Sequence, residues 1–238
     1  MIELTEDFKV KVLAALTEAR DRYDGSDANF AKKYGINKTV YSSLKKGETE
    51  KKISPAKWLE LGRVLGVSLN ERKWNMARTD VFNMIEDDVV FCKEFGKSMM
   101  FVDECAIGKT YSARYLSRTL KNCFYVDASQ CRQERAFIKE LARSVGAELE
   151  GTLEDIKAST KYILNILPRP IVIIDEAGCL SYSSLQLLHE FWNGTQDTCG
   201  WYMMGADGLR TKLQKGKGKS KKQSYKELFS RFSSKYNH

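Results

Sequence analysis

The sequence predicts an α/β protein in which a parallel sheet flanked by helices follows a small all-α domain. Two observations support this fold class. From about residue 99 onwards, short apolar runs alternate with helical patterns, which is typical of a parallel sheet covered on both faces. Before that point, apolar residues recur only at helical spacing. We therefore expect an all-α domain over residues 1–70, a linker over 71–83, and an α/β domain with a basic C-terminal segment over 84–238.

The all-α domain is predicted to contain two longer helices around a short helical pair. Residues 3–23 place apolar residues at helical spacing, and an Asp-Gly-Ser-Asp sequence ends that helix. Residues 28–47 indicate two short helices joined at Gly35, because glycine readily adopts the left-handed backbone of a tight turn. Residues 54–66 form the last helix, with a serine cap and a proline in its first position.

The short helical pair has helix-turn-helix spacing, and the second helix leaves a polar and basic face outward. Such a face suits a DNA groove, and the pair resembles the helix-turn-helix of phage-repressor-like proteins. The residues expected to face the DNA are Asn37, Lys38, Thr39, Ser42, Ser43 and Lys46. The alternative is a structural or protein-binding hairpin, since any helical pair with a glycine turn has a similar pattern.

The α/β part is predicted to contain four strands, each followed by one or more helices. The expected strands are 99–102, 123–126, 171–174 and 201–204, and the expected helices are 109–120, 132–145, 153–166, 182–192 and one from about 208. Two prolines, Pro168 and Pro170, mark the entry into the third strand.

A phosphate-binding loop is predicted directly after the first strand. Backbone amides at a helix N-terminus can cradle phosphates, Lys109 can reach the terminal phosphates, and the Thr110 hydroxyl can bind Mg²⁺. The residues expected to contact ATP are Asp103, Glu104, Cys105, Ala106, Ile107, Gly108, Lys109, Thr110 and Tyr111. The alternative is a buried β-α unit whose Gly-Lys-Thr sequence is incidental.

One position departs from the usual loop, which begins with glycine where this chain has Asp103. Its side chain brings negative charge near the phosphates and a Cβ to a backbone position that could need a positive φ. Ala106 also stands where related ATPases commonly have a second glycine. We therefore expect nucleotide binding with hydrolysis that is slow or stimulated by a partner or by DNA.

The third strand ends in two carboxylates that complete the predicted site. Asp175 at the strand tip can hold Mg²⁺ through water, together with Thr110, and Glu176 can polarise the attacking water. Chance rarely produces this combination, in which one strand is followed by Gly-Lys-Thr and a helix and a later strand is followed by Asp-Glu.

With both motifs placed, the second part resembles an AAA+ ATPase core, and the whole layout resembles the phage Mu B family of transposition target-selection ATPases. The resemblance rests on Ala106–Thr110, Ile171–Glu176 and Ala31–Leu44. It implies a P-loop AAA+ fold and an ATP-dependent homo-oligomer, as a ring or helical filament, on double-stranded DNA. It also implies that the assembly delivers this target DNA to a transposase.

The resemblance implies roles for residues near the end of the chain as well. Arg231 would be the arginine finger presented to a neighbouring subunit, with Arg210 as the second choice. A polar sensor would follow the fourth strand, where Ala206 and Asp207 stand instead of the usual Asn or Thr. In such ATPases, basic residues after the second and fourth strands hold DNA.

Basic charge is concentrated at the end of the sequence. The chain carries +8 overall, and residues 210–238 hold ten basic residues and one acidic residue, a net charge of +9 that leaves −1 for the first 209 residues. Such a block favours a polyanionic partner. The expected phosphate contacts are Arg132, Gln133, Arg135, Lys212, Lys215, Lys217 and Lys219. The alternatives are a solvated helix face for the first group and a solvated Lys/Gly loop for the second.

Composition argues against other classes of protein. The six cysteines form no C-x-x-C pair and there are only two histidines, so we expect no zinc, haem or disulfide framework. No apolar run is long enough for a membrane helix and the start is acidic, so we expect a cytoplasmic protein without membrane contact. Two other functions remain open: a nucleotide-sensing helix-turn-helix transcription regulator of a phage or mobile element, and a replication helicase loader.

Overall fold

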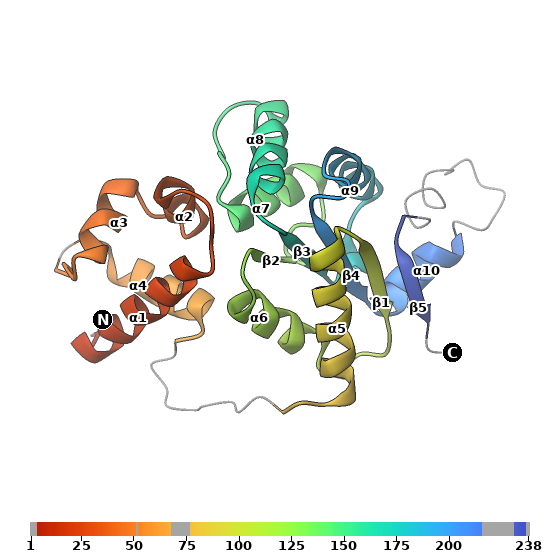
Figure 1. Cartoon of the computed structure of the whole chain (residues 1–238), viewed down its shortest axis with the longest axis horizontal. Coiled ribbons are helices and arrows are strands. Elements are labelled where there is room, and N and C mark those ends of the chain that lie inside the picture. Colours follow the sequence, from red (N-terminus) through yellow and green to blue (C-terminus); the bar gives the residue numbers. More distant parts are fainter. Residues whose placement is uncertain (1–3, 51, 68–76, 216–230, 237–238) are drawn as a thin grey trace.

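The computed structural model describes residues 4–50, 52–67, 77–215 and 231–236. A helical N-terminal part packs beside a layered α/β part (Figure 1). The N-terminal helices are α1 (Glu6–Asp21), α2 (Asp27–Lys33), α3 (Lys38–Lys45) and α4 (Pro55–Leu65). No helix among the described residues is long and apolar enough to cross a membrane.

Each N-terminal helix is preceded by a residue whose side chain caps it. The side-chain oxygens of Thr5, Ser26, Asn37 and Ser54 accept hydrogen bonds from backbone amides of the first turn. Gly35 lies between α2 and α3 with φ +60°, the left-handed conformation expected of the turn. The helices predicted here are confirmed, and Asn37 turns out to be the cap of α3. Whether this pair contacts DNA stays a prediction.

The α/β part contains a parallel sheet in the order β2-β3-β4-β1-β5. Its strands are β1 (Ser98–Val102), β2 (Cys123–Asp127), β3 (Ile171–Asp175), β4 (Gly200–Gly205) and β5 (Ser233–Tyr236). The four predicted strands are confirmed. β5 was not predicted, because its sequence Ser-Ser-Lys-Tyr has no apolar run; it pairs at the sheet edge with β1, in the register Met99 with Ser233.

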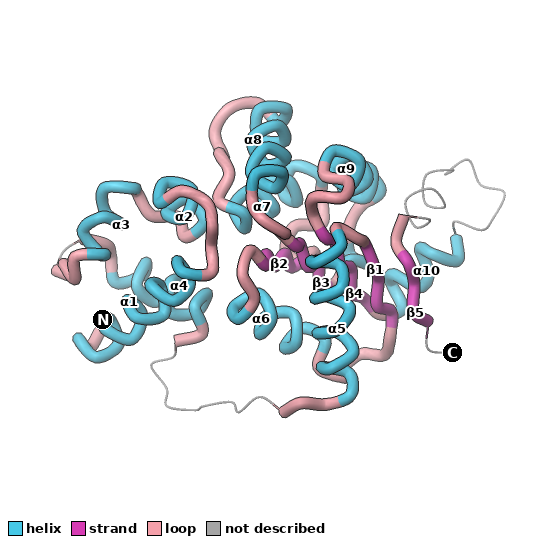
Figure 2. The backbone as a smooth tube through the Cα atoms, in the orientation of Figure 1, coloured by secondary structure: helices cyan, strands magenta, loops and turns pink. Residues whose placement is uncertain are grey.

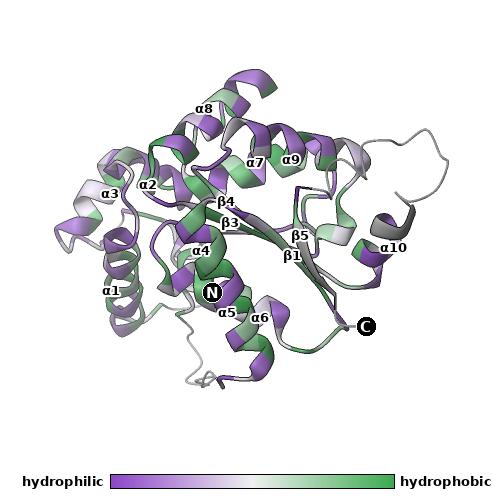
Figure 3. Cartoon of the chain, turned by 45° about the vertical axis from the view of Figure 1, so that its right-hand side comes forward, coloured by the Kyte–Doolittle hydropathy of each residue, from purple (hydrophilic) through white to green (hydrophobic). Residues whose placement is uncertain are grey.

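Helices cover both faces of this sheet (Figure 2). They are α5 (Asp80–Phe95), α6 (Lys109–Thr119), α7 (Glu134–Val145), α8 (Leu153–Ile166), α9 (Tyr182–Gly194) and α10 (Asp207–Lys215), with a short 3-10 helix η1 (Ala177–Cys179) after β3. Alternate strand residues divide between the faces: Ile171 and Ile173 pack with α5 and α6, whereas Val172 and Ile174 pack with α7 and α9. Figure 3 shows the apolar strands enclosed between helices with hydrophilic outer surfaces.

Helix α5 was not predicted, although the other helices of this part were. It begins after the cap Thr79 and ends at Gly96, whose φ is +58°. Residues 80–83, expected to belong to the linker, are therefore helical, and 71–76 lie outside the described residues. Several acidic residues interrupt the apolar spacing of α5, which obscured its pattern.

The N-terminal helices share one continuous apolar cluster with the α7 side of the sheet. The Tyr23 hydroxyl donates to the Val145 carbonyl oxygen at 2.8 Å, and the buried Asn122 amide donates to the Asp24 carboxylate at 3.0 Å. Gly146 ends α7 with φ +83°, and a Cβ built there would stand 2.2 Å from the Asn29 carbonyl oxygen. Close backbone approach thus holds the two parts together.

Candidate functional site

The candidate nucleotide site lies at the carboxyl edge of the parallel sheet. The loop 103–108 connects β1 to α6, and Asp175 and Glu176 follow the end of β3. β4 lies between these two strands, and its last carbonyl, Gly205, accepts a hydrogen bond from the Asp103 amide at 3.3 Å. Ligands of open α/β sheets bind outside this edge, so the sheet places the two predicted motifs where a ligand could contact both.

Lys109 is buried at the start of α6, with 6% of its surface exposed. Its ammonium donates to the carbonyl oxygens of Asp103, at 3.0 Å, and of Glu104. None of the described carboxylates forms an ion pair with it. Because only loop carbonyls hold this ammonium among the described residues, an anion bound in the loop would supply its counter-ion.

The loop itself is strained at a different residue from the one expected. Asp103 does not have a positive φ, whereas Ala106 has φ +65° and Gly108 has φ +97°. The Asp103 carboxylate instead accepts a hydrogen bond from the Glu104 amide at 2.7 Å, which stabilises the start of the loop. The expectation of strain at Asp103 was therefore wrong, and the alanine at 106 carries a cost of about 1 kcal/mol.

The loop residues fit the phosphates of a nucleotide. A Cβ built on Gly108 would meet no atom within 4 Å, so the space beside the loop is open. Gly108 caps α6 without a side-chain hydrogen bond, which leaves the first amides of the helix available to an anion. Thr110 is partly exposed in the first turn, where its hydroxyl can serve as a Mg²⁺ ligand.

Asp175 is a buried carboxylate, with 1% exposure, held by two donors. The Tyr125 hydroxyl donates to its Oδ2 at 3.0 Å, and the Glu176 amide donates to its Oδ1 at 3.0 Å. These bonds fix the orientation of the carboxylate and stabilise its charge, as a Mg²⁺-binding group requires.

Glu176 adopts a left-handed backbone with φ +51° directly after Asp175. Its side chain is partly exposed and forms no hydrogen bond or ion pair with any residue that the structure describes. The next turn is held by Lys212, whose ammonium donates to the carbonyl oxygens of Gly178, at 2.6 Å, and Leu180. Glu176 is thus a carboxylate free to orient water beside a fixed turn.

Arg231 lies away from the loop of its own chain. Its guanidinium stacks over the Trp192 ring at 4.9 Å, and the Trp192 indole donates to the Ser98 hydroxyl at 2.8 Å. Ser98 is the first residue of β1, whereas the loop follows the last residue of that strand. Arg231 therefore lies near the amino ends of the strands, opposite the carboxyl ends where the loop lies. Its role as an arginine finger stays a prediction, as does that of Arg210, which is partly exposed on α10.

The position after β4 lacks a typical sensor side chain, as the sequence indicated. β4 ends at Gly205, Ala206 follows, and Asp207 begins α10 with an exposed side chain. Neither residue supplies the amide or hydroxyl that would contact a terminal phosphate.

The predicted DNA contacts are distributed over separate elements. Lys38, Thr39, Ser42 and Lys46 are exposed on and beside α3, and Ser43 is partly exposed. Arg132, Gln133 and Arg135 are exposed at the start of α7. The Lys212 ammonium is occupied by two carbonyl oxygens. The Lys215 side chain, Lys217 and Lys219 lie outside what the structure describes. All of these contacts remain predictions.

Sequence reasoning missed two residues beside the site. Tyr125 on β2 hydrogen-bonds Asp175, and the Arg114 guanidinium lies over the Tyr125 ring at 5.5 Å and 3.8 Å from the Asp127 carboxylate. The pairing of β2 with β3 brings Tyr125 to this position. Knowing that β2 and β3 are neighbours would have identified Tyr125. The order of strands in the sheet cannot, however, be read from their order in the chain.

Comparison with known families agrees with this geometry. A family model described as AAA domain matches residues 95–213, half of the chain. The match contains the loop, α6, Asp175, Glu176 and β4, and it leaves out the N-terminal helices. No curated protein matches the sequence. Since the matched region contains every element of the nucleotide site described above, the chain belongs to the AAA domain family of P-loop ATPases.

Proposed function

We propose that this protein binds and hydrolyses ATP with Mg²⁺ and uses the nucleotide state to assemble on double-stranded DNA. The observation that carries the proposal is the pairing of a buried, counter-ion-free Lys109 with the oriented Asp175 and the free Glu176. Lys109 and the amides of α6 would hold the phosphates, and Thr110 and Asp175 would hold the metal. Mg²⁺, when bound, neutralises charge on the transferring phosphoryl group, and Glu176 orients the attacking water.

Hydrolysis by the isolated chain is expected to be slow. Ala106 holds a conformation that glycine would adopt without strain, and no amide or hydroxyl side chain follows β4. Arg231 lies at the opposite edge of the sheet, so it could reach only a nucleotide held by a neighbouring subunit. We therefore propose that a ring or helical filament completes the site.

DNA is the proposed surface for that assembly. The exposed polar and basic residues of α3, the arginines at the start of α7 and the net charge of +8 support a phosphate-rich partner. The resemblance in layout to the Mu B family extends this proposal to the delivery of target DNA to a transposase.

The nucleotide part of the proposal is tested with point variants. Lys109→Ala removes a charge-assisted contact to phosphate and should weaken the binding of a fluorescent ATP analogue by about 10- to 100-fold. Glu176→Gln should bind the analogue normally and lower the hydrolysis rate by about 100-fold or more. Lys139→Ala, a partly exposed lysine on α7, is the matched control and should change neither quantity. Normal binding by Lys109→Ala would contradict the proposal.

The assembly part is tested by negative-stain imaging with duplex DNA under three conditions: no nucleotide, ADP and a non-hydrolysable ATP analogue. Filaments or rings should form only with the ATP analogue and should be absent in Lys109→Ala. Arg231→Ala should bind nucleotide normally but fail to assemble or to hydrolyse. Discrete particles that ignore nucleotide would instead favour a transcription regulator, and co-purification with a hexameric helicase would favour a loader.

A further inference from the structure

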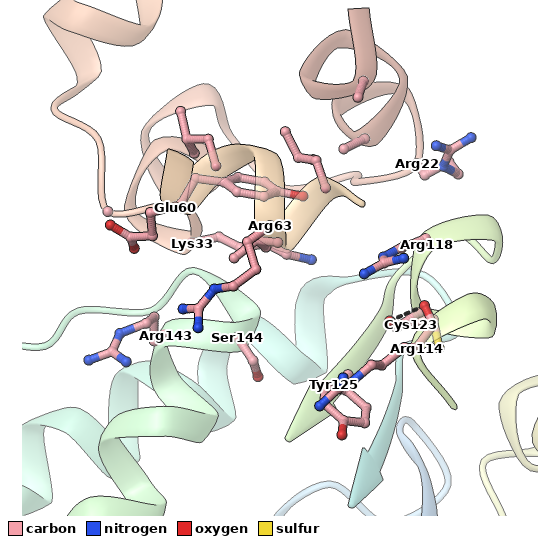
Figure 4. Close-up of a pocket in the computed structure, with 18 of the residues that line it drawn as sticks. Arg22, Lys33, Glu60, Arg63, Arg114, Arg118, Cys123, Tyr125, Arg143 and Ser144 are labelled. Carbon is pink, nitrogen blue, oxygen red and sulfur yellow. Dashed lines mark hydrogen bonds between the residues drawn. The ribbon is translucent and has the colours of Figure 1, made fainter. Parts of the chain in front are cut away.

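A cavity of about 760 Å³ lies between the N-terminal helices and the α/β part (Figure 4). Its lining on one side comes from α1, the end of α2 and α4, and on the other side from α6, α7 and β2. None of residues 103–111 lines it, although Tyr125, whose hydroxyl donates to Asp175, does. Its volume is in the range of cavities that bind small molecules.

The lining is strongly basic. Seven basic residues line the cavity, namely Arg22, Lys33, Lys57, Arg63, Arg114, Arg118 and Arg143, against three acidic residues, Glu18, Glu60 and Glu140. Each acidic residue already has a partner within this set, at 3.4 Å from Arg22, 3.0 Å from Lys57 and 2.6 Å from Arg143 respectively. Arg114 lies 3.8 Å from Asp127 outside the cavity.

Three cations remain without a carboxylate partner in the part of the chain that the structure describes. Lys33, Arg63 and Arg118 come from α2, α4 and α6, and Figure 4 shows their side chains extending into the space between the two walls. The Arg118 guanidinium lies against Gly66, where a built Cβ would be 2.7 Å from Nη1. Like charges gathered in one cavity repel each other, so these residues gain little from proximity unless an anion joins them.

Aromatic rings, and no described carboxylate, surround the Lys33 ammonium. Its ammonium lies 4.7 Å from the centre of the Phe124 ring, 5.7 Å from that of Tyr23 and 5.9 Å from that of Tyr34. Burial lowers the pKa of Lys33 to about 8, and burial followed by the neighbouring Arg114 lowers the pKa of Arg118. These side chains are therefore held in a position where the charged form is disfavoured.

We propose that this cavity binds a small molecule carrying two or more phosphate groups, held by Lys33, Arg63 and Arg118. Guanidinium groups match phosphate oxygens in a bidentate geometry, and a lysine adds a point charge. Leu61, Leu65 and Tyr34 supply apolar surface for the rest of the ligand. A DNA duplex would have to separate the two walls, which the Tyr23 and Asn122 hydrogen bonds hold together.

Inorganic tripolyphosphate is the probe, titrated calorimetrically into the full chain carrying Lys109→Ala so that the nucleotide loop does not contribute. One equivalent should bind. Adding Arg63→Gln or Arg118→Gln should weaken binding by about 10-fold or more, since each removes a charge-assisted contact. Lys139→Gln, a partly exposed lysine on α7 outside the cavity, is the control and should bind normally.

Thermal unfolding provides a second readout, because a ligand of the folded state raises the melting temperature. Tripolyphosphate should raise it for Lys109→Ala and raise it less for the cavity variants. If Arg118→Gln fails to fold, Arg63→Gln decides, since Arg63 is exposed in the last turn of α4 and its replacement should not disturb folding. No binding to Lys109→Ala, an equal loss in Lys139→Gln, or displacement of the probe by a short DNA duplex would each overturn the proposal.

Discussion

The carboxyl edge of the sheet and the cavity beside the N-terminal helices both contain basic side chains without a carboxylate partner among the described residues, but the two sites are built differently. At the sheet edge, Lys109 belongs to a short contiguous motif and two loop carbonyls hold its ammonium. In the cavity, Lys33 and Arg118 lie 85 positions apart in the sequence, and aromatic rings rather than acceptors surround Lys33. A local motif therefore reveals a site in the sequence, whereas a site made by packing two parts together stays hidden.

The two sites should therefore respond differently to a change at the boundary between the parts. Gly146→Ala adds a Cβ that would stand 2.2 Å from the Asn29 carbonyl oxygen, at a residue with φ +83°. Strain and backbone clash together should lower the free energy of unfolding by about 3 kcal/mol, measured by urea denaturation. Tripolyphosphate binding in the cavity should be lost, while ATP-analogue binding in the folded protein should persist.

Gly47→Ala is the matched control for this change. Gly47 also has a left-handed backbone, with φ +81°, but a Cβ there would meet no atom within 4 Å. It should cost only about 1 kcal/mol from strain. Equal costs for the two variants would show that close approach at Gly146 does not hold the parts together.

The second change compares the two lysines directly. Lys33→Met removes a cation whose pKa burial has lowered from 10.5 to about 8, a difference worth about 3 kcal/mol, less about 1 kcal/mol for lost contacts with aromatic rings. We expect a gain of about 2 kcal/mol in stability at pH 7. Lys109→Met should bring no such gain, because it leaves two loop carbonyls without their donor.

The gain at Lys33 should depend on pH. Between pH 8 and 10.5 the unfolded chain binds more protons than the folded one, so the stability of the natural protein rises with pH. Lys33→Met lacks this rise, and its advantage should shrink across that range. The groups that face Lys33 stay neutral there, since burial raises the pKa of Cys123 to about 12 and raises those of Tyr23 and Tyr34. A constant advantage from pH 8 to 10.5 would contradict this account.

The sequence predicted the elements whose patterns are local. Four strands were readable as apolar runs, and the N-terminal helices were readable from caps and spacing. β5 was not, because a polar edge strand is defined by its partner β1 rather than by its own composition. The loop strain expected at Asp103 lies at Ala106, which has the positive φ, whereas the Asp103 carboxylate accepts a hydrogen bond from the next amide.

The candidate nucleotide site was predictable to the same extent. Lys109, Thr110, Asp175 and Glu176 lie in short motifs at strand ends, and parallel strands bring those ends to one edge. Tyr125 could not be assigned, because its contact with Asp175 depends on which strands are neighbours. The cavity depends on how two parts pack, which no single segment of the sequence encodes.

Tyr125 joins the two regions, and removing its hydroxyl should have the smallest effect of these changes. Its side chain lines the cavity while its hydroxyl donates to Asp175 at 3.0 Å, so removing that one oxygen deletes a donor to Asp175 and keeps the ring in place. Tyr125→Phe should lower stability by about 1 kcal/mol and raise the Mg²⁺ concentration needed for half-maximal hydrolysis by about 5-fold, since Asp175 loses one of its two donors. Tripolyphosphate binding should not change, because the ring remains.

Tyr162→Phe, 66% exposed on α8, is the control. An unchanged Mg²⁺ dependence would mean that the Glu176 amide alone orients Asp175, and an altered tripolyphosphate affinity would mean that the two regions are coupled through this residue.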